Sequence, residues 1–369
     1  MILSKYPRVI QNEIFYNMKY SELLLLSFVS NNMKKLIKSS QMKRFKAMGS
    51  IEYDTDRTDQ PLVRIHRTDF KEKIIIIIMK ILEYETRNDY FQLNVSGMKI
   101  DFRLCTEDRD SYRDEKSYPV AVYPKSEKQC VIESIHNYFL DFFGDSVEYV
   151  WKMDDDRYKF YIPFIPQLQN LSLCVNLLLG DDFADMENLE NFLSSSPVMK
   201  SIFMDANTSN REPFNPESKL YQAQSIDIAT HEPTFPAFLI HFQGRQAIID
   251  CSICHTSELV QFVNRWKSGE ALRMLEYLRI SVDMYEIPKT RLLRRIGAKT
   301  IDATKQPPVH QMPLIYDWCC LGPNTFPIKS YSYVVRESDN RVASVQIHGL
   351  TFSFGVWDKT EEEFLRMMD

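Results

Sequence analysis

One short segment carries residue types that bind haem or metal. "CSICH", Cys251 to His255, has the Cys-x-x-Cys-His spacing of c-type haem attachment, and thiolate and imidazole groups are also zinc ligands. Haem attachment needs an export route and an axial ligand, and zinc needs two more ligands, for which the adjacent Cys319 and Cys320 have poor geometry. Because "AIIDCSIC" alternates like a strand, we expect Cys251 and Cys254 on opposite faces of that strand, with neither haem nor zinc.

Other patterns of catalytic chemistry are missing from the sequence. None of the ten glycines forms Gly-x-Gly, and Gly-Lys-Ser/Thr, Gly-x-Ser-x-Gly and His-x-x-x-His do not occur. "DDDR", Asp154 to Arg157, has carboxylates for a cation but reads more simply as an acidic turn before a strand. His136 and His241 are expected to be packing or surface residues. We therefore expect that the chain is not an enzyme and has no cofactor.

Composition limits the class of protein. The chain has 369 residues, 44% hydrophobic and 26% charged, with a net charge of -5, which is typical of a folded protein of two or three domains. The 45 basic and 50 acidic residues leave no global positive field, so a dedicated nucleic-acid binder is not expected. Seven scattered cysteines favour a reducing compartment, the cytoplasm or the nucleus.

Near the N-terminus lies the apolar segment "YPRVIQNEIFYNMKYSELLLLSFVSNN", which we call the helical opening of the chain. We expect this segment to form amphipathic helices. It lacks the layout of a signal peptide, and its apolar run is less than half of the roughly 20 residues that span a membrane. Pro7 can begin a helix in which apolar residues recur on one stripe, namely Val9, Ile10, Ile14 and Met18. The helix is expected to end near Lys19.

A second helix is expected from Ser21 and Glu22, and the leucines Leu23 to Leu26 with Val29 cover more than half of its circumference. A short helix that is apolar on so many sides must be buried on more than one face. Because barely 45 residues are available for a local core, one of these faces is expected to contact a partner.

This opening resembles an F-box, the adaptor-binding motif of SCF-type ubiquitin ligases. Tyr6-Pro7 falls where the family has Leu-Pro, Val29-Ser30 falls on its Val-Ser pair, and Met33 replaces a tryptophan that many members carry. The resemblance implies a Skp-type adaptor and, through it, a cullin-RING ligase as partners. The residues that it implies for adaptor contact are Pro7, Ile10, Ile14, Met18, Leu23, Leu26 and Val29.

The next region, to about residue 124, has short β-type runs: "IEYD", "LVRIH", "FQLNV" and "MKIDFRL". The last two are joined at Ser96-Gly97, which predicts a hairpin because glycine accepts positive φ. "IIIIIMKIL", Ile74 to Leu82, is predicted to be a buried strand, although its length also suits a helix. "CTEDRDSYRDEKSY" is predicted to be an exposed loop.

Strand and helix signals alternate after residue 125. An amphipathic helix ends at Gly144, and strand-like segments follow near residues 173, 202, 228, 249 and 278, with helices such as "MENLENFLSSS" and "TSELVQFVNRWKSG" between them. A strand and helix repeated every 20 to 30 residues indicates a leucine-rich-repeat-like solenoid. No repeat carries the full leucine and asparagine consensus, so the pattern supports the architecture alone.

The C-terminal part carries a second resemblance. It has three β-rich runs with turns at Asp339-Asn340 and His348-Gly349, then a helix with Thr360 and Glu363 at capping-box spacing. It is similar to the type-2 F-box-associated domain of a nematode-expanded family, with Asn340 where that family usually has glycine. The residues that carry the likeness are Trp266, Gly269, Leu275, Leu278, Arg336, Arg341, Ala343, Val356 and Trp357.

We therefore expect an α+β protein with a helical F-box at 1–46, a β-rich connecting region at 47–125 and an LRR-like α/β domain ending in a β meander at 126–369. The resemblances imply a substrate receptor of an SCF-type ligase that holds an unknown target protein and contacts neither nucleic acid nor membrane. The alternatives are a solenoid binding module with a decayed F-box, or an unrecognised enzyme. The loops "DANTSNREPFNPESK" and "TKQPPVHQMP" are candidate target contacts.

Overall fold

The structure is a computed structural model that describes residues 5–55, 60–67, 74–84, 89–106, 117–153, 164–179, 186–206, 214–230, 235–318 and 322–368. The chain divides into two compact units. The first comprises residues 1–154 and 163–172, and the second comprises residues 155–162 and 173–369. The helical opening and the connecting region both lie within the first of these units.

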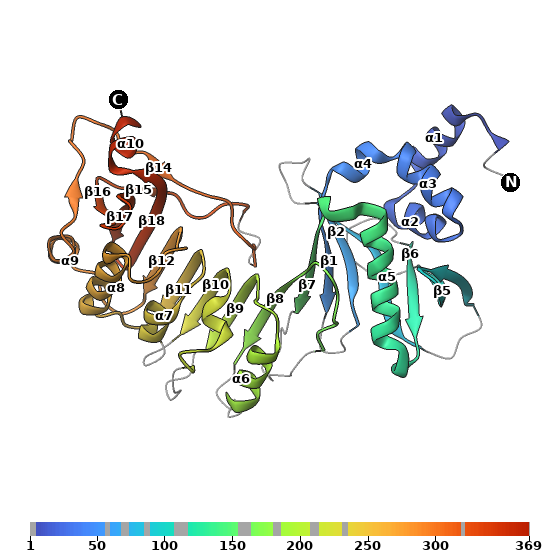
Figure 1. Ribbon diagram of the computed structural model, residues 1–369, viewed down its shortest axis with the longest axis horizontal. Coiled ribbons are helices and arrows are strands. Elements are labelled where there is room, and N and C mark those ends of the chain that lie inside the picture. The colour runs from blue at the N-terminus through green and yellow to red at the C-terminus, as the bar shows by residue number, and fades with distance from the viewer. Residues whose placement is uncertain are drawn as a thin grey trace. The chain divides into compact units, whose positions relative to one another are not determined.

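The first unit contains helices followed by a mixed sheet, as the α+β prediction requires. Its elements are α1 (Arg8–Asn17), α2 (Tyr20–Phe28), α3 (Asn31–Ser40), α4 (Met42–Lys46), β1 (Met48–Thr55), β2 (Leu62–Arg67), β3 (Ile74–Glu83), β4 (Phe91–Val95), β5 (Met98–Thr106), β6 (Ser117–Tyr123), η2 (Lys125–Glu127), α5 (Lys128–Phe143), η3 (Gly144–Ser146) and β7 (Glu148–Met153). Figure 1 shows these elements along the ribbon.

The sheet of this unit has the order β7-β1-β2-β3-β6-β5-β4. β1 is parallel to β7 and β3 is parallel to β6, while the other neighbours are antiparallel. The predicted isoleucine strand is confirmed as β3. The predicted hairpin is also confirmed, because Ser96 and Gly97 join β4 to β5 with φ of 49° and 93°.

Helix α5 packs along the sheet through a continuous apolar side, which includes Ile132, Ile135 and Phe139, each with 0% exposure. It ends where predicted, at Gly144, whose φ of 71° is readily accessible to glycine. His136 on the same side is buried. Its Nδ1 accepts a 2.9 Å hydrogen bond from the Tyr53 hydroxyl, and its Nε2 donates to the Gln169 carbonyl at 2.8 Å.

The second unit alternates strands and helices before it turns antiparallel. Its elements are β8 (Leu171–Leu178), α6 (Met186–Ser195), β9 (Ser201–Ala206), η4 (Lys219–Gln222), β10 (Ser225–Thr230), α7 (Phe235–His241), β11 (Gln246–Cys251), α8 (Thr256–Ser268), β12 (Tyr277–Val282), α9 (Lys289–Arg295), β13 (Lys299–Thr300), β14 (Val309–His310), β15 (Ile328–Lys329), β16 (Ser332–Val335), β17 (Arg341–His348), β18 (Thr351–Thr360) and α10 (Glu361–Arg366).

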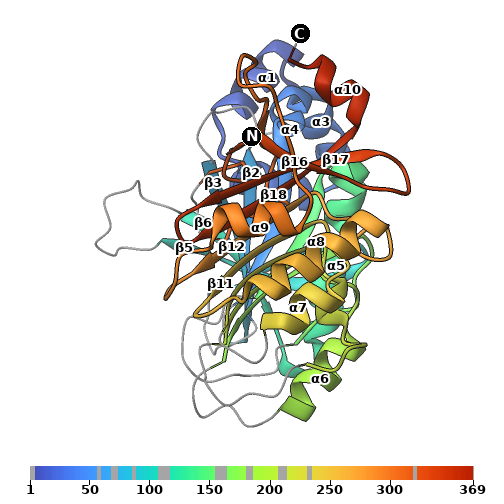
Figure 2. The ribbon, with the colours of Figure 1, turned by 90° about the vertical axis from the view of Figure 1, so that its left-hand side faces the viewer.

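Strands β8 to β12 are parallel and lie in chain order, and β18, β17, β16 and β13 continue the sheet with antiparallel pairing. Helices α6, α7 and α8 lie on one face of the parallel strands, as Figures 1 and 2 both show. The apolar residues of that face fill the core between sheet and helices; Ile249 and Leu278, for example, pack near Phe262 of α8. The five strand positions predicted after residue 125 are confirmed.

The turn signals of the second unit are also confirmed. Asn340 has a φ of 58° between β16 and β17, so asparagine supplies the left-handed conformation that this turn requires. Thr360 and Glu363 cap α10 reciprocally. Gly269 ends α8 with a φ of 73°, and a Cβ there would lie 2.6 Å from the Ser338 Oγ, so the position requires glycine for two reasons.

The prediction for the cysteine segment is wrong in part. Cys251 is buried at the last position of β11, but Cys254 lies beyond the strand, half-buried, and His255 is the N-cap of α8. The strand ends early because the chain must turn into α8, whose first turn is capped by Glu258 accepting from the His255 N–H at 2.8 Å. The two cysteines therefore do not share a strand.

Candidate functional site

Helix α1 places its predicted apolar stripe away from the core of its own chain. Its buried residues are Phe15, with 0% exposure, and Gln11, whose Nε2 donates to the Tyr6 carbonyl at 2.7 Å. Val9 is 76% exposed and Ile10 is 46% exposed. Ile14 and Met18, which complete the stripe, are half-buried. An apolar stripe that its own chain leaves open is typical of a surface that a partner covers.

Helix α2 divides the leucine run between core and surface. Its first turn is capped by Glu22, which accepts from the Lys19 N–H at 2.8 Å. Leu23 and Leu24 have 0% exposure, whereas Leu25 and Leu26 are half-buried. The chain therefore covers one side of this helix and leaves the other partly open among the described residues.

Arg44 of α4 fixes α1 relative to α2. Its guanidinium donates to the carbonyls of Phe15 and Tyr16 at 3.0 and 3.2 Å and to that of Met18 at 3.0 Å. These carbonyls lie at the end of α1, where the regular helical N–H donors run out, although the Phe15 carbonyl also accepts from the Met18 N–H at 3.3 Å. The guanidinium also lies 4.5 Å from the ring centroid of Tyr20, the first residue of α2. The open stripe is therefore carried by a helix with a fixed orientation.

The helical opening is anchored to α5 by aromatic rings. Phe28 packs edge-on against Tyr138, with ring centroids 4.5 Å apart, and Phe45 packs in the same way on Phe142 at 5.1 Å. Lys34 forms an ion pair with Asp141, and the hydrogen bond from this ammonium lowers the pKa of the Asp141 carboxyl. The side chains of these N-terminal helices thus pack in the same core as α5.

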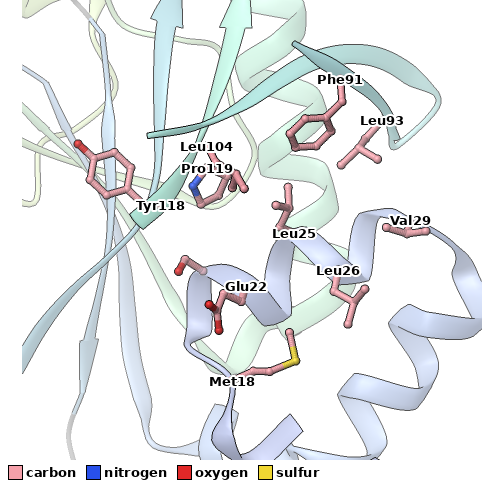
Figure 3. Close-up of a pocket in the computed structure, with 11 residues that line it drawn as sticks. Met18, Glu22, Leu25, Leu26, Val29, Phe91, Leu93, Leu104, Tyr118 and Pro119 are labelled. Carbon is pink, nitrogen blue, oxygen red and sulfur yellow. The ribbon is translucent and has the colours of Figure 1, made fainter. Parts of the chain in front are cut away.

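A largely apolar groove opens where α2 faces strands β4, β5 and β6 (Figure 3). Its cavity volume is about 570 Å³. One wall comes from the helices and the other from the strands, and Figure 3 shows Leu25 and Leu26 on the helical side with Phe91 and Leu93 opposite. The lining residues are Met18, Ser21, Glu22, Leu25, Leu26, Val29, Phe91, Leu93, Leu104, Tyr118 and Pro119.

The structure groups the seven predicted contact residues into three sets. Met18, Leu26 and Val29 meet at the groove, and Met18 also ends the open stripe of α1. Pro7, Ile10 and Ile14 lie on or beside α1, with Pro7 as its exposed N-cap.

Leu23, by contrast, is a core residue of the first unit with 0% exposure. Its place in the F-box motif favoured it as a contact residue, whereas Leu25 and Leu26 of the same run are more open. Val9 and Tyr16, the latter 68% exposed, were left out of the predicted set, as was Leu25 at the groove. Helical spacing already placed Val9 on the stripe, but nothing in the sequence shows which stripe of α1 the chain covers for itself.

The described residues contain no group of three or more His, Cys, Asp or Glu side chains arranged to hold a metal ion. Among the described residues, Cys105, Cys130, Cys174, Cys251 and Cys254 form no disulfide bond. The acidic segment at Asp154 to Arg157 and the pair Cys319 and Cys320 lie outside the described residues. In the part of the chain that is described, no helix has the length and apolarity needed to cross a membrane.

Comparison with known proteins bears on the helical opening alone. The family model described as F-box domain matches residues 7–45. No curated protein and no solved structure gives a match to the chain. The match begins at Pro7 and ends within α4, so it spans the helices that carry the open stripe and the helical wall of the groove. Residues 7–45 of this chain are an F-box domain.

Proposed function

We propose that this chain is a substrate-receptor subunit of an SCF-type ubiquitin ligase, with the F-box docking on a Skp-type adaptor. The observation that carries the proposal is the open stripe of α1: Val9 and Ile10 face outward from a matched F-box while Phe15 faces inward. Full burial of one such aliphatic side chain stabilises a contact by about 1.5 to 3 kcal/mol, so a few of them supply an interface with a sizeable driving force.

The adaptor surface in this proposal extends from α1 to the groove. Met18 belongs to both, because it completes the stripe and lines the groove beside Leu26 and Val29. Val29 is 59% exposed at the end of α2. In this proposal, the two leucines of the run that the chain leaves half-buried belong to one continuous apolar surface that the adaptor covers.

The proposed mechanism is positional. The F-box would hold the chain on the adaptor and cullin, and the second unit would hold a target protein near the ubiquitin-charged enzyme. Rate enhancement would then come from effective concentration and orientation, with no proton transfer by this chain. Such a role belongs in the cytoplasm or the nucleus.

The second unit is proposed to be a type-2 F-box-associated domain that binds the target. Its support is the arrangement of two residues that carry the resemblance: Trp266 is buried, and the Arg336 guanidinium lies 5.2 Å from its ring centroid. Arg336 also pairs with Asp339 in the turn before β17, at 2.6 Å. The short succession of parallel strands in this unit is proposed to act as a solenoid, which offers an extended face for binding.

A solenoid module with a decayed F-box is the second candidate. Two departures from the motif favour it, because Tyr6 is 44% exposed in place of leucine and Met33 stands in place of tryptophan. Size-exclusion chromatography of the full chain with a Skp-type adaptor and a cullin separates the two. Co-elution of all three proteins is expected for a receptor. Elution of the chain alone, with the adaptor and cullin still bound to each other, would favour the decayed module.

A further inference from the structure

A second cavity lies in the second unit, on the sheet face opposite α6, α7 and α8. In-register pairing sets the residues of this face in rows across β9 to β12. One row contains Ser201, Ser225, Gln246 and Tyr277, and the next contains Phe203, Asp227, Ile248 and Arg279. The other wall of the cavity comes from residues 311–318 and 324–327, which we call the crossing segment because its hydrogen bonds reach both β11 and β9.

The crossing segment is held in place by hydrogen bonds to buried residues of the first row. The Gln246 side chain is 3% exposed; its Nε2 donates to the Pro313 carbonyl at 2.8 Å and its Oε1 accepts from the Ile315 N–H at 3.0 Å. The Trp318 indole donates to the Ser201 Oγ at 2.8 Å. The walls of the cavity are therefore preorganised.

Aromatic rings and carboxylates share this cavity, whose volume is about 220 Å³. Tyr316 and Trp318 are packed with ring centroids 4.7 Å apart. The lining residues are Ser225, Asp227, Gln246, Ile248, Tyr277, Gln311, Leu314, Tyr316, Asp317, Trp318, Asn324, Thr325, Phe326 and Pro327. The volume is below the range of pockets for drug-sized ligands, about 300 to 1,000 Å³, and suits a single side chain.

Asp227 determines which kind of ligand the cavity would bind. It has neither an ion pair nor a hydrogen bond among the residues that the structure describes, although its carboxyl is largely buried. Burial, with a further contribution from Asp250, raises the pKa of Asp227 to about 6. A buried carboxylate without a partner is destabilising, so a cation that enters the cavity would relieve this cost.

Arg279 is not the cation that neutralises Asp227. It stands in the same row as Asp227, but β11 and its Ile248 separate them, which is about 10 Å at the usual strand spacing. Its guanidinium lies 3.9 Å from the ring centroid of Phe326 and is held there by the ring face. Phe326, which lines the cavity, therefore already packs against one cation.

We propose that this cavity binds the ammonium group of a lysine side chain, which enters between Tyr316, Trp318 and the Asp227 carboxylate. The aromatic faces attract a cation and pack on its methylene stem, and the carboxylate accepts its N–H donors. The lysine would come from the target protein, so the proposal in this form rests on the receptor function. The cavity is too small and too acidic for a phosphorylated side chain.

The test uses a capped lysine, Nα-acetyl-lysine N-methylamide, with the full chain and NMR detection of the Trp318 indole N–H. The norleucine analogue has the same stem without the charge, and capped arginine tests the choice of cation. We expect the lysine probe to shift the Trp318 signal with millimolar affinity, the norleucine probe to have no effect, and Asp227→Asn to weaken lysine binding by about tenfold.

Asp250→Asn is the matched control, because it removes the same charge from an exposed carboxylate on the same face that does not line the cavity. It should change lysine binding by less than about twofold. Equal effects of Asp227→Asn and Asp250→Asn, tighter binding of arginine, or equal binding of norleucine would each overturn the proposal. Lysine binding by a chain that fails to bind the adaptor would instead refute the receptor function and leave this site standing.

Discussion

The hydroxyl of Tyr138 on α5 donates a 2.7 Å hydrogen bond to the hydroxyl of Ser27 on α2, and both groups are buried. The Ser27 hydroxyl in turn donates to the Leu24 carbonyl at 2.6 Å. This chain of hydrogen bonds joins the F-box domain to the sheet-bearing part of the first unit. The F-box helices are therefore held in place by buried contacts with α5. Substitutions on their open stripe should change binding without changing the fold.

Tyr138→Phe removes the donor at this junction while keeping the ring that packs on Phe28. We expect the free energy of unfolding to fall by about 1 kcal/mol, because a buried hydrogen bond is lost and the Ser27 hydroxyl loses a partner. Urea denaturation measures this change. Tyr16→Phe, at a 68% exposed tyrosine, is the control and should leave stability unchanged. Equal effects of the two substitutions would contradict the role of the junction.

Leu23→Ala and Val9→Ala compare the stability cost of truncating a core residue of α2 with that of truncating a surface residue of α1. Leu23 has 0% exposure, so its truncation should lower the free energy of unfolding by about 2 to 5 kcal/mol. Val9 is 76% exposed, and its truncation should change stability by less than about 0.5 kcal/mol. Thermal unfolding of both variants checks this. A stable Leu23→Ala protein would show that this leucine is not part of the core.

His136 should make the first unit sensitive to acid. Burial lowers the pKa of its imidazole below the ordinary value of 6.5, and the hydrogen bond to the Gln169 carbonyl offsets this only in part. The Tyr53 hydroxyl donates to the unprotonated Nδ1 of the neutral ring. The unfolded chain therefore binds the proton more tightly, and stability is lost as the pH falls below about 6.5. We expect His136→Gln to be less stable than the native chain at pH 7.5 but to lose less between pH 6.5 and 5.

His348→Gln is the control for that comparison, because His348 is exposed at the end of β17. The melting temperature of this variant should follow the native chain at every pH. A His136→Gln profile as steep as the native one would assign the acid sensitivity to other groups, among them His310, whose pKa is also lowered by burial.

Asp227 has the opposite pH dependence. Its pKa rises from 3.8 to about 6 on folding, so the folded chain binds the proton more tightly and loses stability as the pH rises from about 4 through 6. Asp227→Asn should therefore be more stable than the native chain at pH 7.5, by about 1 to 3 kcal/mol, with the difference fading towards pH 4. Chemical denaturation at the two pH values measures it. A variant that is less stable at pH 7.5 would contradict the unpaired state of this carboxylate.

The local signals in the sequence predicted much of the fold. Gly97, Gly144 and Asn340 end or turn their elements because few other residues adopt positive φ at no cost. Five isoleucines in a row favoured a strand because β-branched side chains pack well on a sheet, and β3 is that strand.

What the sequence did not predict depends on contacts between distant segments. Phe15 and Ile10 are both apolar on α1, and only the packing of the other helices decides that Phe15 is covered. The cavity proposed to bind lysine is lined by Asp227 and Trp318, which are far apart in sequence. They come together because the crossing segment forms hydrogen bonds with Ser201 and Gln246. Neither relationship leaves a periodic pattern in the sequence.

The most direct test of the central proposal is adaptor capture by the full chain and by a double variant, Ile10→Asp with Val29→Asp. Both residues are apolar and exposed within the F-box domain, so the new carboxylates are solvated in the free chain and buried only on docking. Val198→Asp, at a 52% exposed valine in the second unit, is the matched control, and circular dichroism must show all three proteins folded. The proposal predicts capture of the adaptor by the native chain and by Val198→Asp, and loss of capture, at least tenfold, by the double variant. Undiminished capture by the double variant, or no capture by the native chain, would contradict it.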